Sequence, residues 1–176
     1  MANPIILVTG GARSGKSKYG EQRVMATGPR RLYVATAEAG DEEMVRRIAR
    51  HKKQRGGQWT TIEEPVELTE VLLAWRGRVD GALVDCLTLW LSNLLLRRDG
   101  KQVEEKVEQL AATLPRLDFS VLLVANEVSW GIVPDNPLAR QFRDLAGWAN
   151  QLIAAVATEV ILMVAGIPLT IKTTTP

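Results

Sequence analysis

Residues 5–17 read Ile5-Ile6-Leu7-Val8-Thr9-Gly10-Gly11-Ala12-Arg13-Ser14-Gly15-Lys16-Ser17. The first four residues form an uninterrupted aliphatic run, which is typical of a strand buried on both faces of a parallel sheet. Paired glycines end the run and permit a tight turn, and a stretch with helical periodicity begins near Lys16. The sequence therefore predicts a strand, a glycine-rich turn and a helix in direct succession.

Further aliphatic runs alternate with helical segments along the rest of the chain. The predicted strands after the first cover residues 32–36, 82–84, 121–125 and 160–165, and residues 167–172 are a candidate for a short edge strand. The predicted helices cover residues 16–26, 42–54, 66–75, 88–97, 103–114 and 138–158. Strands that alternate with helices predict an α/β fold with a mainly parallel β-sheet flanked by helices.

The size and composition of the chain exclude several classes of protein. Its 176 residues fit a single domain, and we expect residues 172–176 to fray. The composition, with 46% hydrophobic and 24% charged residues, is normal for a globular protein. A formal charge of +2 is too small for a typical nucleic-acid binder, so we expect no nucleic-acid partner. The single cysteine, Cys86, excludes an internal disulfide.

The chain contains no apolar run of the roughly 18 residues that a membrane span requires. The apolar start is interrupted by glycines too early for a signal peptide. We therefore expect a cytoplasmic protein with no membrane span.

The turn after the first strand matches the P-loop pattern G-x-x-x-x-G-K-[ST], with a strand before it and a helix after it. In such a loop, backbone amides and the helix N-terminus surround phosphate oxygens, a lysine reaches the β and γ phosphates, and a hydroxyl binds Mg²⁺. Those last two roles fall to Lys16 and Ser17. A chance match in a glycine-rich turn is the alternative. The expected fold is thus a P-loop NTPase-like α/β domain that binds a nucleoside triphosphate.

Two acidic residues follow later predicted strands at the edge where ligands of open α/β sheets bind. Asp85 directly follows the strand at residues 82–84 and is the candidate second ligand for Mg²⁺, although an aspartate there can instead cap the next helix. Glu127 stands in the same relation to the strand at residues 121–125. Either carboxylate is a candidate base for phosphoryl transfer on position alone.

The only histidine, His51, lies near the end of the predicted helix at residues 42–54, among the cations Arg50, Lys52, Lys53 and Arg55. On helical spacing alone it is a partly packed histidine near an apolar stripe. If the neighbouring cations keep the imidazole neutral, it is instead a competent nucleophile toward phosphorus, and the cations can bind a triphosphate. A solvated basic face explains the cations equally well.

With these motifs in view, the chain closely resembles the family of bifunctional adenosylcobinamide kinases / adenosylcobinamide-phosphate guanylyltransferases of cobalamin biosynthesis. The resemblance covers nearly the whole chain and is carried by Val8–Ser17, Tyr33–Thr36, Arg47–Lys52, Asp85–Thr88, Asn126–Pro134, Ala139–Asp144 and Val164–Pro168. The string Asn126–Pro134 and the Arg-His-Lys placement are far more specific than the P-loop.

The resemblance implies two reactions, both with nucleotide substrates. ATP or GTP phosphorylates the terminal hydroxyl of adenosylcobinamide, and GMP is then transferred from GTP to the adenosylcobinamide phosphate with release of pyrophosphate. In the family a histidine carries the GMP covalently, and the matching position is His51. The resemblance also implies a homotrimer.

The family's nucleotide-contacting positions also carry over. They match Gly10, Gly11, Ala12, Arg13, Ser14, Gly15, Lys16, Ser17, Ala35, Thr36, Ala37, Lys52, Lys53, Gln54, Arg55, Glu63 and Asp85. For Glu63, capping of the helix near Pro65 is the preferred interpretation from sequence alone. Some relatives have two adjacent histidines at Arg50-His51 and a glutamate at Asp85. These departures leave one candidate nucleophile and shorten one carboxylate without removing its charge.

Two other functions remain open on the residues alone. A kinase for a small-molecule hydroxyl would transfer the γ phosphate and never bind GMP covalently. A nucleotide-gated regulatory module would hydrolyse slowly and show no corrinoid-dependent turnover. Trp130 is either a hydrophobic plug under a loop or part of a groove for the large corrinoid.

Overall fold

The elements of the computed structural model, which describes residues 3–38, 56–97 and 100–174, follow the predicted alternation. In chain order they are β1 (Ile5–Gly10), α1 (Lys16–Met25), β2 (Arg31–Ala35), the 3-10 turn η1 (Gly56–Gln58), β3 (Thr60–Glu63), α3 (Leu68–Ala74), β4 (Gly81–Asp85), α4 (Leu87–Arg97), α5 (Gly100–Thr113), the 3-10 turn η2 (Leu114–Arg116), β5 (Ser120–Val124), α6 (Pro137–Val156), β6 (Glu159–Val164) and β7 (Ile167–Thr173).

The described strands form one sheet in the order β3-β2-β4-β5-β1-β6-β7. All neighbouring pairs are parallel except β6 and β7, which form an antiparallel hairpin. β1 lies inside the sheet, where Leu7 is level with Leu123 of β5 and Val160 of β6. The P-loop therefore emerges at the carboxyl edge of the parallel strands, between the ends of two neighbours.

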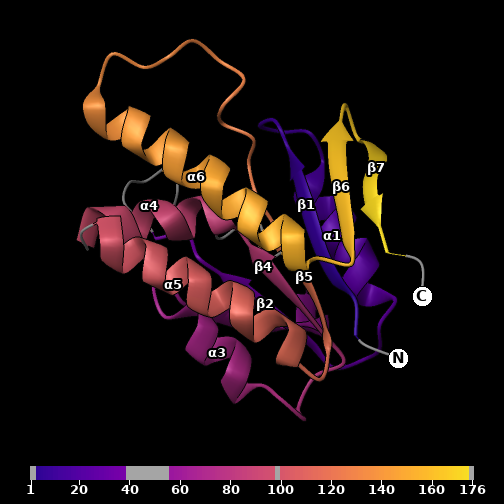
Figure 1. Ribbon diagram of the computed structural model, residues 1–176. Helices are drawn as coiled ribbons and strands as arrows, with labels where there is room; N and C mark the ends of the chain where they lie inside the picture. The colour runs from indigo at the N-terminus through magenta and orange to yellow at the C-terminus, as the bar shows by residue number, and fades with distance from the viewer. Residues whose placement is uncertain (1–2, 39–55, 98–99, 175–176) are drawn as a thin grey trace.

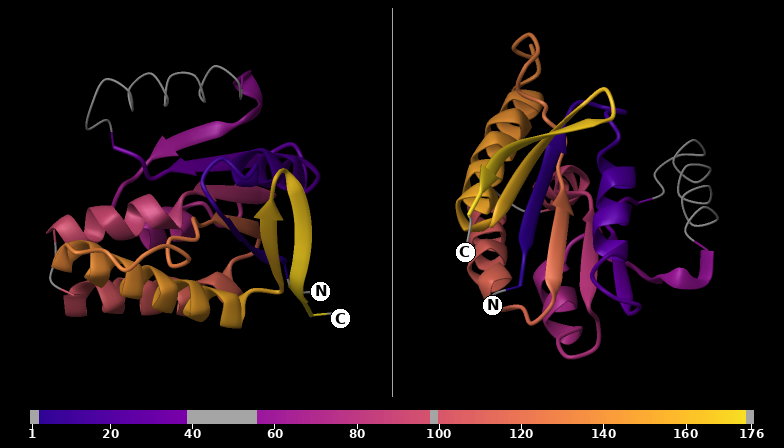
Figure 2. Two further views of the ribbon diagram at one scale, coloured as in Figure 1. Left: turned by 90° about the horizontal axis from the view of Figure 1, so that it is seen from above. Right: turned by 90° about the vertical axis from the view of Figure 1, so that its right-hand side faces the viewer.

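Helices cover both faces of this sheet (Figures 1 and 2). α1 packs on β4 and β5 on one face, whereas α3, α4, α5 and α6 lie on the other. α1 approaches its face closely because residue 20 is glycine: a Cβ there would lie 2.9 Å from methyl carbons of Leu83 and Leu122. The first turn of α1, which carries Lys16, is thus held firmly against the sheet.

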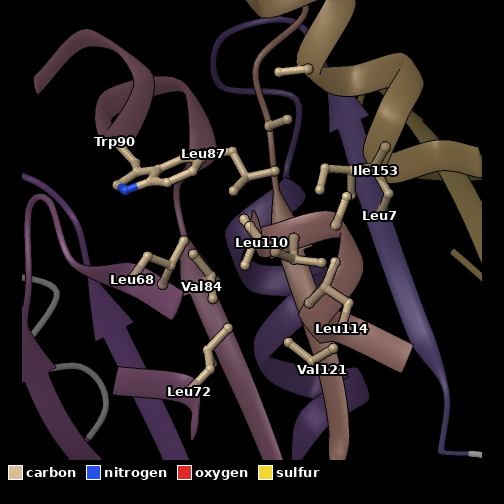
Figure 3. Packing of buried hydrophobic residues seen from close by; sticks show 14 of the residues in the cluster. Leu7, Leu68, Leu72, Val84, Leu87, Trp90, Leu110, Leu114, Val121 and Ile153 are labelled. Carbon is tan, nitrogen blue, oxygen red and sulfur yellow. The ribbon is translucent and has the colours of Figure 1, made fainter. Parts of the chain in front are cut away.

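The larger apolar cluster fills the space between the sheet and the four helices α3 to α6 (Figure 3). Alternate strand residues such as Leu7, Val84 and Val121 face it, and Leu110 and Leu114 enter it from the opposite side. Trp90, with 1% of its surface exposed, is also buried there, and its indole nitrogen donates a 2.8 Å hydrogen bond to the Val66 carbonyl. No polar group of that tryptophan is therefore left unpaired.

The predicted elements are largely confirmed. All five predicted strands and five of the six predicted helices are present within one to two residues of the expected bounds, except that α5 begins three residues earlier than expected. The helix predicted over residues 42–54 lies outside the described residues. In the described parts of the chain, no helix is long and apolar enough to span a membrane.

Two features of the sheet differ from the sequence predictions. β3 was not predicted, because its only half-buried residue is Ile62 and the strand carries no aliphatic run. The candidate edge strand is confirmed as β7, but the expected fraying from residue 172 is wrong, since β7 continues to Thr173. Lys172 lies in this strand, and its ammonium donates hydrogen bonds of 2.8 and 2.9 Å to the carbonyls of Ala154 and Ala155.

Candidate nucleotide-binding site

Glycine is required at two positions of the loop between β1 and α1. Gly10 has a φ of 143°, and a Cβ there would lie 2.4 Å from the Met163 carbonyl oxygen of β6. Gly15 is the N-cap of α1 and has a φ of 98°, a left-handed conformation that side chains disfavour. The backbone between them curls at the N-terminus of α1, which is the geometry that a phosphate group requires.

Lys16 is buried under this loop, with 6% of its surface exposed. Its ammonium donates hydrogen bonds of 2.8 Å to the Gly10 carbonyl and 2.7 Å to the Gly11 carbonyl, and lies 3.4 Å from the Ser14 hydroxyl. Burial lowers the pKa of Lys16, and the opposing influences are Cys86 and the Asp85 carboxylate. The lysine therefore lies inside the loop and within electrostatic reach of the β4 carboxylate.

Two other segments brace the loop through the backbone. The Glu127 amide, just after β5, donates a 3.0 Å hydrogen bond to the Gly10 carbonyl. The Gly166 amide, at the β6–β7 turn, donates one of the same length to the Ser14 carbonyl. Gly11, Ala12 and Arg13 remain exposed at the rim, and Ser17 is half-buried in the first turn of α1. The residues of the P-loop motif, Gly10–Ser17, are thus brought together as expected, and we call this loop the phosphate cradle.

Asp85 ends β4 two strands away from the P-loop strand. It is level with Ala35 of β2, and its Oδ2 accepts a 2.7 Å hydrogen bond from the Tyr33 hydroxyl. Ser17 and Asp85 together offer a hydroxyl and a carboxylate oxygen. These are the ligand types that Mg²⁺ prefers when it is bound with a nucleotide and keeps several waters, so the donor set fits that ion. Within the described ranges, no group of three or more His, Cys, Asp or Glu side chains could hold a metal.

The segment Ala35–Ala37 follows the carboxyl end of β2. Thr36 is fully buried, and its hydroxyl accepts a 2.8 Å hydrogen bond from the Cys86 amide and donates a 2.7 Å one to the Cys86 carbonyl. Asn93 of α4 donates a 2.8 Å hydrogen bond to the Thr36 carbonyl. These bonds fix Thr36 beside the end of β4. Ala35 is buried and Ala37 half-buried at the same edge.

The residue next to Asp85 is the single cysteine. The Asp85–Cys86 peptide bond is cis. Burial, with a further contribution from Asp85, raises the pKa of the Cys86 thiol to about 11. This thiol is therefore protonated at neutral pH and acts as a small buried side chain, not as a nucleophile.

Glu63 ends β3 on the far side of β2, where it is exposed and level with Ala35. The turn before α3 is held by the neighbouring residue, Glu64. An oxygen of the Glu64 carboxylate accepts 2.8 Å hydrogen bonds from the amides of Val66 and Glu67. Glu63 lies at the carboxyl edge of the sheet, next to the segment Ala35–Ala37.

The other predicted site residues form one continuous stretch of the chain, from His51 to Arg55. His51, Lys52, Lys53, Gln54 and Arg55 lie outside the described residues. The chain resumes at η1 and enters β3, which is the neighbour of β2.

The loop that follows β5 begins at the cradle and carries exposed apolar side chains. The Asn126 amide donates a 2.6 Å hydrogen bond to the Thr88 hydroxyl of α4, and the Glu127 carboxylate accepts hydrogen bonds from the amide and hydroxyl of Ser129. Beyond this turn, Trp130 is 76% exposed and Ile132 96% exposed. The interpretation of Trp130 as a plug under a surface loop is therefore wrong for this structure.

Sequence analysis missed two contributors to the site, Tyr33 and Gly166. Tyr33 reads as one more apolar member of a strand, and only the adjacency of β2 and β4 brings it to Asp85. Gly166 reads as a hairpin turn residue, and its contact with Ser14 depends on β6 being the neighbour of β1. Both contacts follow from strand order, which a single sequence does not encode locally.

The fold and the phosphate cradle define the class: this is a P-loop nucleotide-binding protein of the α/β type. Solved structures of low sequence identity share the fold. The flagellar accessory protein FlaH from Methanocaldococcus jannaschii has a TM-score of 0.57 at 13% identity, and the match covers 98% of this chain and 79% of that one. The RadB recombinase has a TM-score of 0.56 at 14% identity, covering 92% and 74%.

Within that class the family is specific. The model of the cobinamide kinase / cobinamide phosphate guanyltransferase family matches residues 6–171, and the chain belongs to this family. The bifunctional adenosylcobalamin biosynthesis protein CobP of Pseudomonas aeruginosa is 44% identical, over 94% of this chain and 96% of its own length. The proteins named CobU from Salmonella typhimurium and Escherichia coli are 41% and 39% identical, each over 96% of this chain and 99% of their own length. The resemblance stated from the motifs is confirmed.

Proposed function

We propose that this protein phosphorylates adenosylcobinamide with ATP or GTP and then transfers GMP from GTP to the product, giving adenosylcobinamide-GDP and pyrophosphate. The observation that carries the proposal is the family match, which runs from β1 to β7 and includes the complete P-loop. The buried Lys16 and the Asp85 carboxylate at the same sheet edge support nucleotide chemistry at this site.

The first reaction is a phosphoryl transfer. The terminal hydroxyl oxygen of adenosylcobinamide attacks the γ phosphorus, the bond to the β-γ bridging oxygen breaks, and the hydroxyl proton is released. The P-loop amides and Lys16 stabilise the negative charge on the β and γ phosphates, and this positioning is most of what phosphoryl transfer needs from a protein. Mg²⁺ bound by Ser17 and Asp85 would neutralise part of the same charge.

The second reaction is a double displacement at the α phosphorus, with His51 proposed as the nucleophile. A neutral imidazole nitrogen attacks the phosphorus, an N–P bond forms, and pyrophosphate leaves. A phosphate oxygen of the substrate then attacks the same phosphorus, the N–P bond breaks, and the imidazole is released. Lys52, Lys53, Gln54 and Arg55 follow His51 and are proposed, with Glu63, Ala35, Thr36 and Ala37, to contact the guanine nucleotide.

We propose a homotrimer as the working assembly. The family resemblance supports this state, and so does the outer edge of the sheet. β7 exposes Ile167, Leu169 and Ile171, at 68%, 56% and 60%. Apolar side chains on a free edge strand are a liability for a monomer, so coverage by another subunit is favourable. Light scattering coupled to gel filtration measures the mass directly, and a monomer at micromolar concentration would contradict the proposal.

The decisive experiment uses GTP labelled in turn at the α and γ phosphates. The purified protein with Mg²⁺ and each GTP is denatured, and acid-labile, base-stable label on the chain is counted. We expect label from the α position only, and none in the His51→Ala variant. Lys18→Ala, an exposed cation on α1, serves as the matched control and retains the label.

An absence of α label in a protein that still binds GTP would overturn the transferase half of the proposal. A protein that phosphorylates adenosylcobinamide without forming the labelled intermediate is a simple hydroxyl kinase. One that hydrolyses GTP with no response to adenosylcobinamide is a nucleotide-gated module, which would overturn both halves.

A further inference from the structure

Tyr33 lies beneath the carboxyl end of the sheet with 3% of its surface exposed. It occupies the middle of β2, where it is level with Leu83 of the adjacent β4. Side chains two residues apart on a strand share a face, so Tyr33, Leu83 and Asp85 all face α1 and the cradle. An aromatic side chain can reach a diagonal neighbour on the next strand. The phenol of Tyr33 reaches Asp85 in this way.

The contact is a hydrogen bond of 2.7 Å from the phenol to Oδ2 of Asp85. An aspartate at a strand end can otherwise rotate about two side-chain bonds. A donor that engages one carboxylate oxygen restricts that rotation and leaves the other oxygen for a further ligand. Mg²⁺ is demanding in its octahedral geometry, so a carboxylate in one fixed orientation is a better ligand than one that rotates.

Tyr33 is itself held by Trp59. The two rings pack edge to face, with centroids 5.9 Å apart and planes at 86°. Trp59 lies between η1 and β3, and β3 runs beside β2. Tyr33 also belongs to the apolar cluster on the α1 side of the sheet, so its ring cannot turn its hydroxyl away from Asp85 without disturbing that packing.

We propose that Tyr33 is a positioning residue for the metal-binding carboxylate. By donating to Oδ2, it presents the remaining oxygen of Asp85 to the divalent cation that accompanies the nucleotide. Trp59 holds the phenol in place. This inference rests on the proposed function only because that function gives Asp85 the role of a Mg²⁺ ligand. It assigns to Tyr33 no contact with substrate.

The two tyrosines of the chain provide a matched pair for the test. Tyr19 of α1 packs against the same apolar cluster, but its hydroxyl oxygen accepts a 2.8 Å hydrogen bond from Arg23. Tyr33→Phe and Tyr19→Phe each remove one hydroxyl and keep the ring. Only the first removes the donor to Asp85. Both variants preserve the ring packing, so thermal unfolding close to that of the wild-type protein is expected for each.

The measurement is Mn²⁺ binding, followed by electron paramagnetic resonance, to the complex of the full chain with the α,β-methylene analogue of GTP. The analogue's affinity in the absence of metal is measured in parallel. We expect Tyr33→Phe to weaken Mn²⁺ binding about 10-fold, the lower end of what loss of a partner of a metal ligand costs. Metal-free analogue affinity stays within about 2-fold, because the P-loop is intact. Tyr19→Phe leaves both quantities unchanged.

Two further variants separate the possible outcomes. Trp59→Leu removes the ring contact, and a weakening of Mn²⁺ binding in the same direction but of smaller size is expected. In an Asp85→Asn background, Tyr33→Phe should have no additional effect, because the two residues act as one unit. Turnover by Tyr33→Phe should recover at high Mg²⁺, with a raised KM for the metal and an unchanged kcat.

Wild-type Mn²⁺ binding by Tyr33→Phe, together with its loss in Asp85→Asn, would overturn the role of Tyr33 and leave the proposed function standing. Wild-type Mn²⁺ binding by Asp85→Asn would overturn the metal role of Asp85 and the inference with it. An equal weakening by Tyr33→Phe in the presence and absence of the Asp85 carboxylate would show that the phenol does not act through Asp85, which also overturns the inference.

Discussion

The Nζ atom of Lys16 lies 2.8 Å from the carbonyl oxygen of Gly10 and donates a hydrogen bond to it. A second hydrogen bond, of 2.7 Å, goes to the Gly11 carbonyl. The P-loop lysine therefore donates to the neutral carbonyl oxygens of its own loop. Binding of a triphosphate exchanges these neutral acceptors for charged ones, which form stronger hydrogen bonds with an ammonium group.

Replacement of Lys16 by methionine should weaken GTP binding and slow both transfer reactions without unfolding the protein. Hydrogen bonds to charged groups contribute about 1.5–3 kcal/mol, so GTP affinity should fall roughly 10- to 100-fold and both transfer reactions should fall with it. Folding is spared because the Gly10 carbonyl keeps its bond from the Glu127 amide and Gly11 is exposed to water. Calorimetric titration and thermal unfolding measure the two effects. A large fall in unfolding temperature would contradict this account.

The same lysine should make nucleotide binding pH-dependent. Burial lowers the pKa of Lys16 below the ordinary 10.5 in the free protein, whereas bound phosphate favours the charged form and raises it again. Binding then requires proton uptake above the free-state pKa, so affinity for metal-free GTP should decline as pH rises, from a point below pH 10.5. The decline should be absent in Lys16→Arg, which stays charged. An identical decline in that variant would assign the effect to another group.

Lys16 should affect folding stability in the opposite direction: nucleotide affinity declines with rising pH, whereas the contribution of Lys16 to stability increases. A lysine with a lowered folded-state pKa binds its proton less tightly in the folded than in the unfolded chain. The contribution of Lys16 to the free energy of unfolding therefore rises as pH increases from its folded pKa toward the unfolded value. Urea denaturation of the wild-type protein and Lys16→Met at a series of pH values rising toward the ordinary lysine pKa of 10.5 isolates this contribution, since the methionine variant lacks the titrating group. As pH rises, the free energy of unfolding of the wild-type protein should increase relative to that of Lys16→Met.

Glycine substitutions in two helices should have opposite effects on stability. A Cβ at Gly20 of α1 would lie 2.9 Å from Leu122 and Leu83, both buried, so Gly20→Ala should cost about 1 kcal/mol or more despite the better helix propensity of alanine. A Cβ at Gly147 of α6 would meet no atom within 4 Å apart from its chain neighbours and the nearby backbone of its own helix. Gly147→Ala should therefore gain about 0.5–1 kcal/mol. Urea midpoints that shift in the same direction for both variants would contradict the packing argument.

The sequence predicted the helices and strands that are determined by residues close together in the chain. The strand, turn and helix over residues 5–17 are encoded within one short stretch, and the five buried strands are each marked by an aliphatic run. β3 lacks such a run because an edge strand with both faces largely exposed needs no continuous apolar surface. Edge strands are accordingly the elements that a hydrophobic pattern identifies least well.

The sequence identified individual residues of the candidate site but not the hydrogen bonds that join them. The P-loop motif identified Lys16 and Ser17, and position after a strand identified Asp85. The hydrogen bond from Tyr33 to Asp85 requires that β2 and β4 are neighbours although β3 intervenes in the chain. Strand order is decided by packing of the whole sheet, so no local pattern encodes it. The distinction between Glu63 and Glu64 likewise depends on where β3 ends.

Trp130 should contribute to recognition of the corrinoid and not to nucleotide binding. Its loop starts at the phosphate cradle, through the bond between the Glu127 amide and Gly10, and extends away from the sheet edge toward the start of α6 (Figure 1). Trp130 is 76% exposed, and Val133 and Leu138 nearby in the chain are 57% and 46% exposed. A large substrate with its reacting hydroxyl on a flexible arm can contact this apolar surface while the hydroxyl reaches the P-loop.

Trp130→Ala should therefore raise the KM for adenosylcobinamide roughly 10-fold, the effect of losing about 1.4 kcal/mol of apolar contact. The α-phosphate label from GTP and the unfolding temperature should not change, because the side chain is exposed in the free protein. Leu73→Ala is the control: Leu73 is 41% exposed on α3, at the opposite end of the sheet from the loop (Figure 1). Steady-state kinetics with adenosylcobinamide decides the question, since an unchanged KM in Trp130→Ala would remove this loop from the corrinoid site.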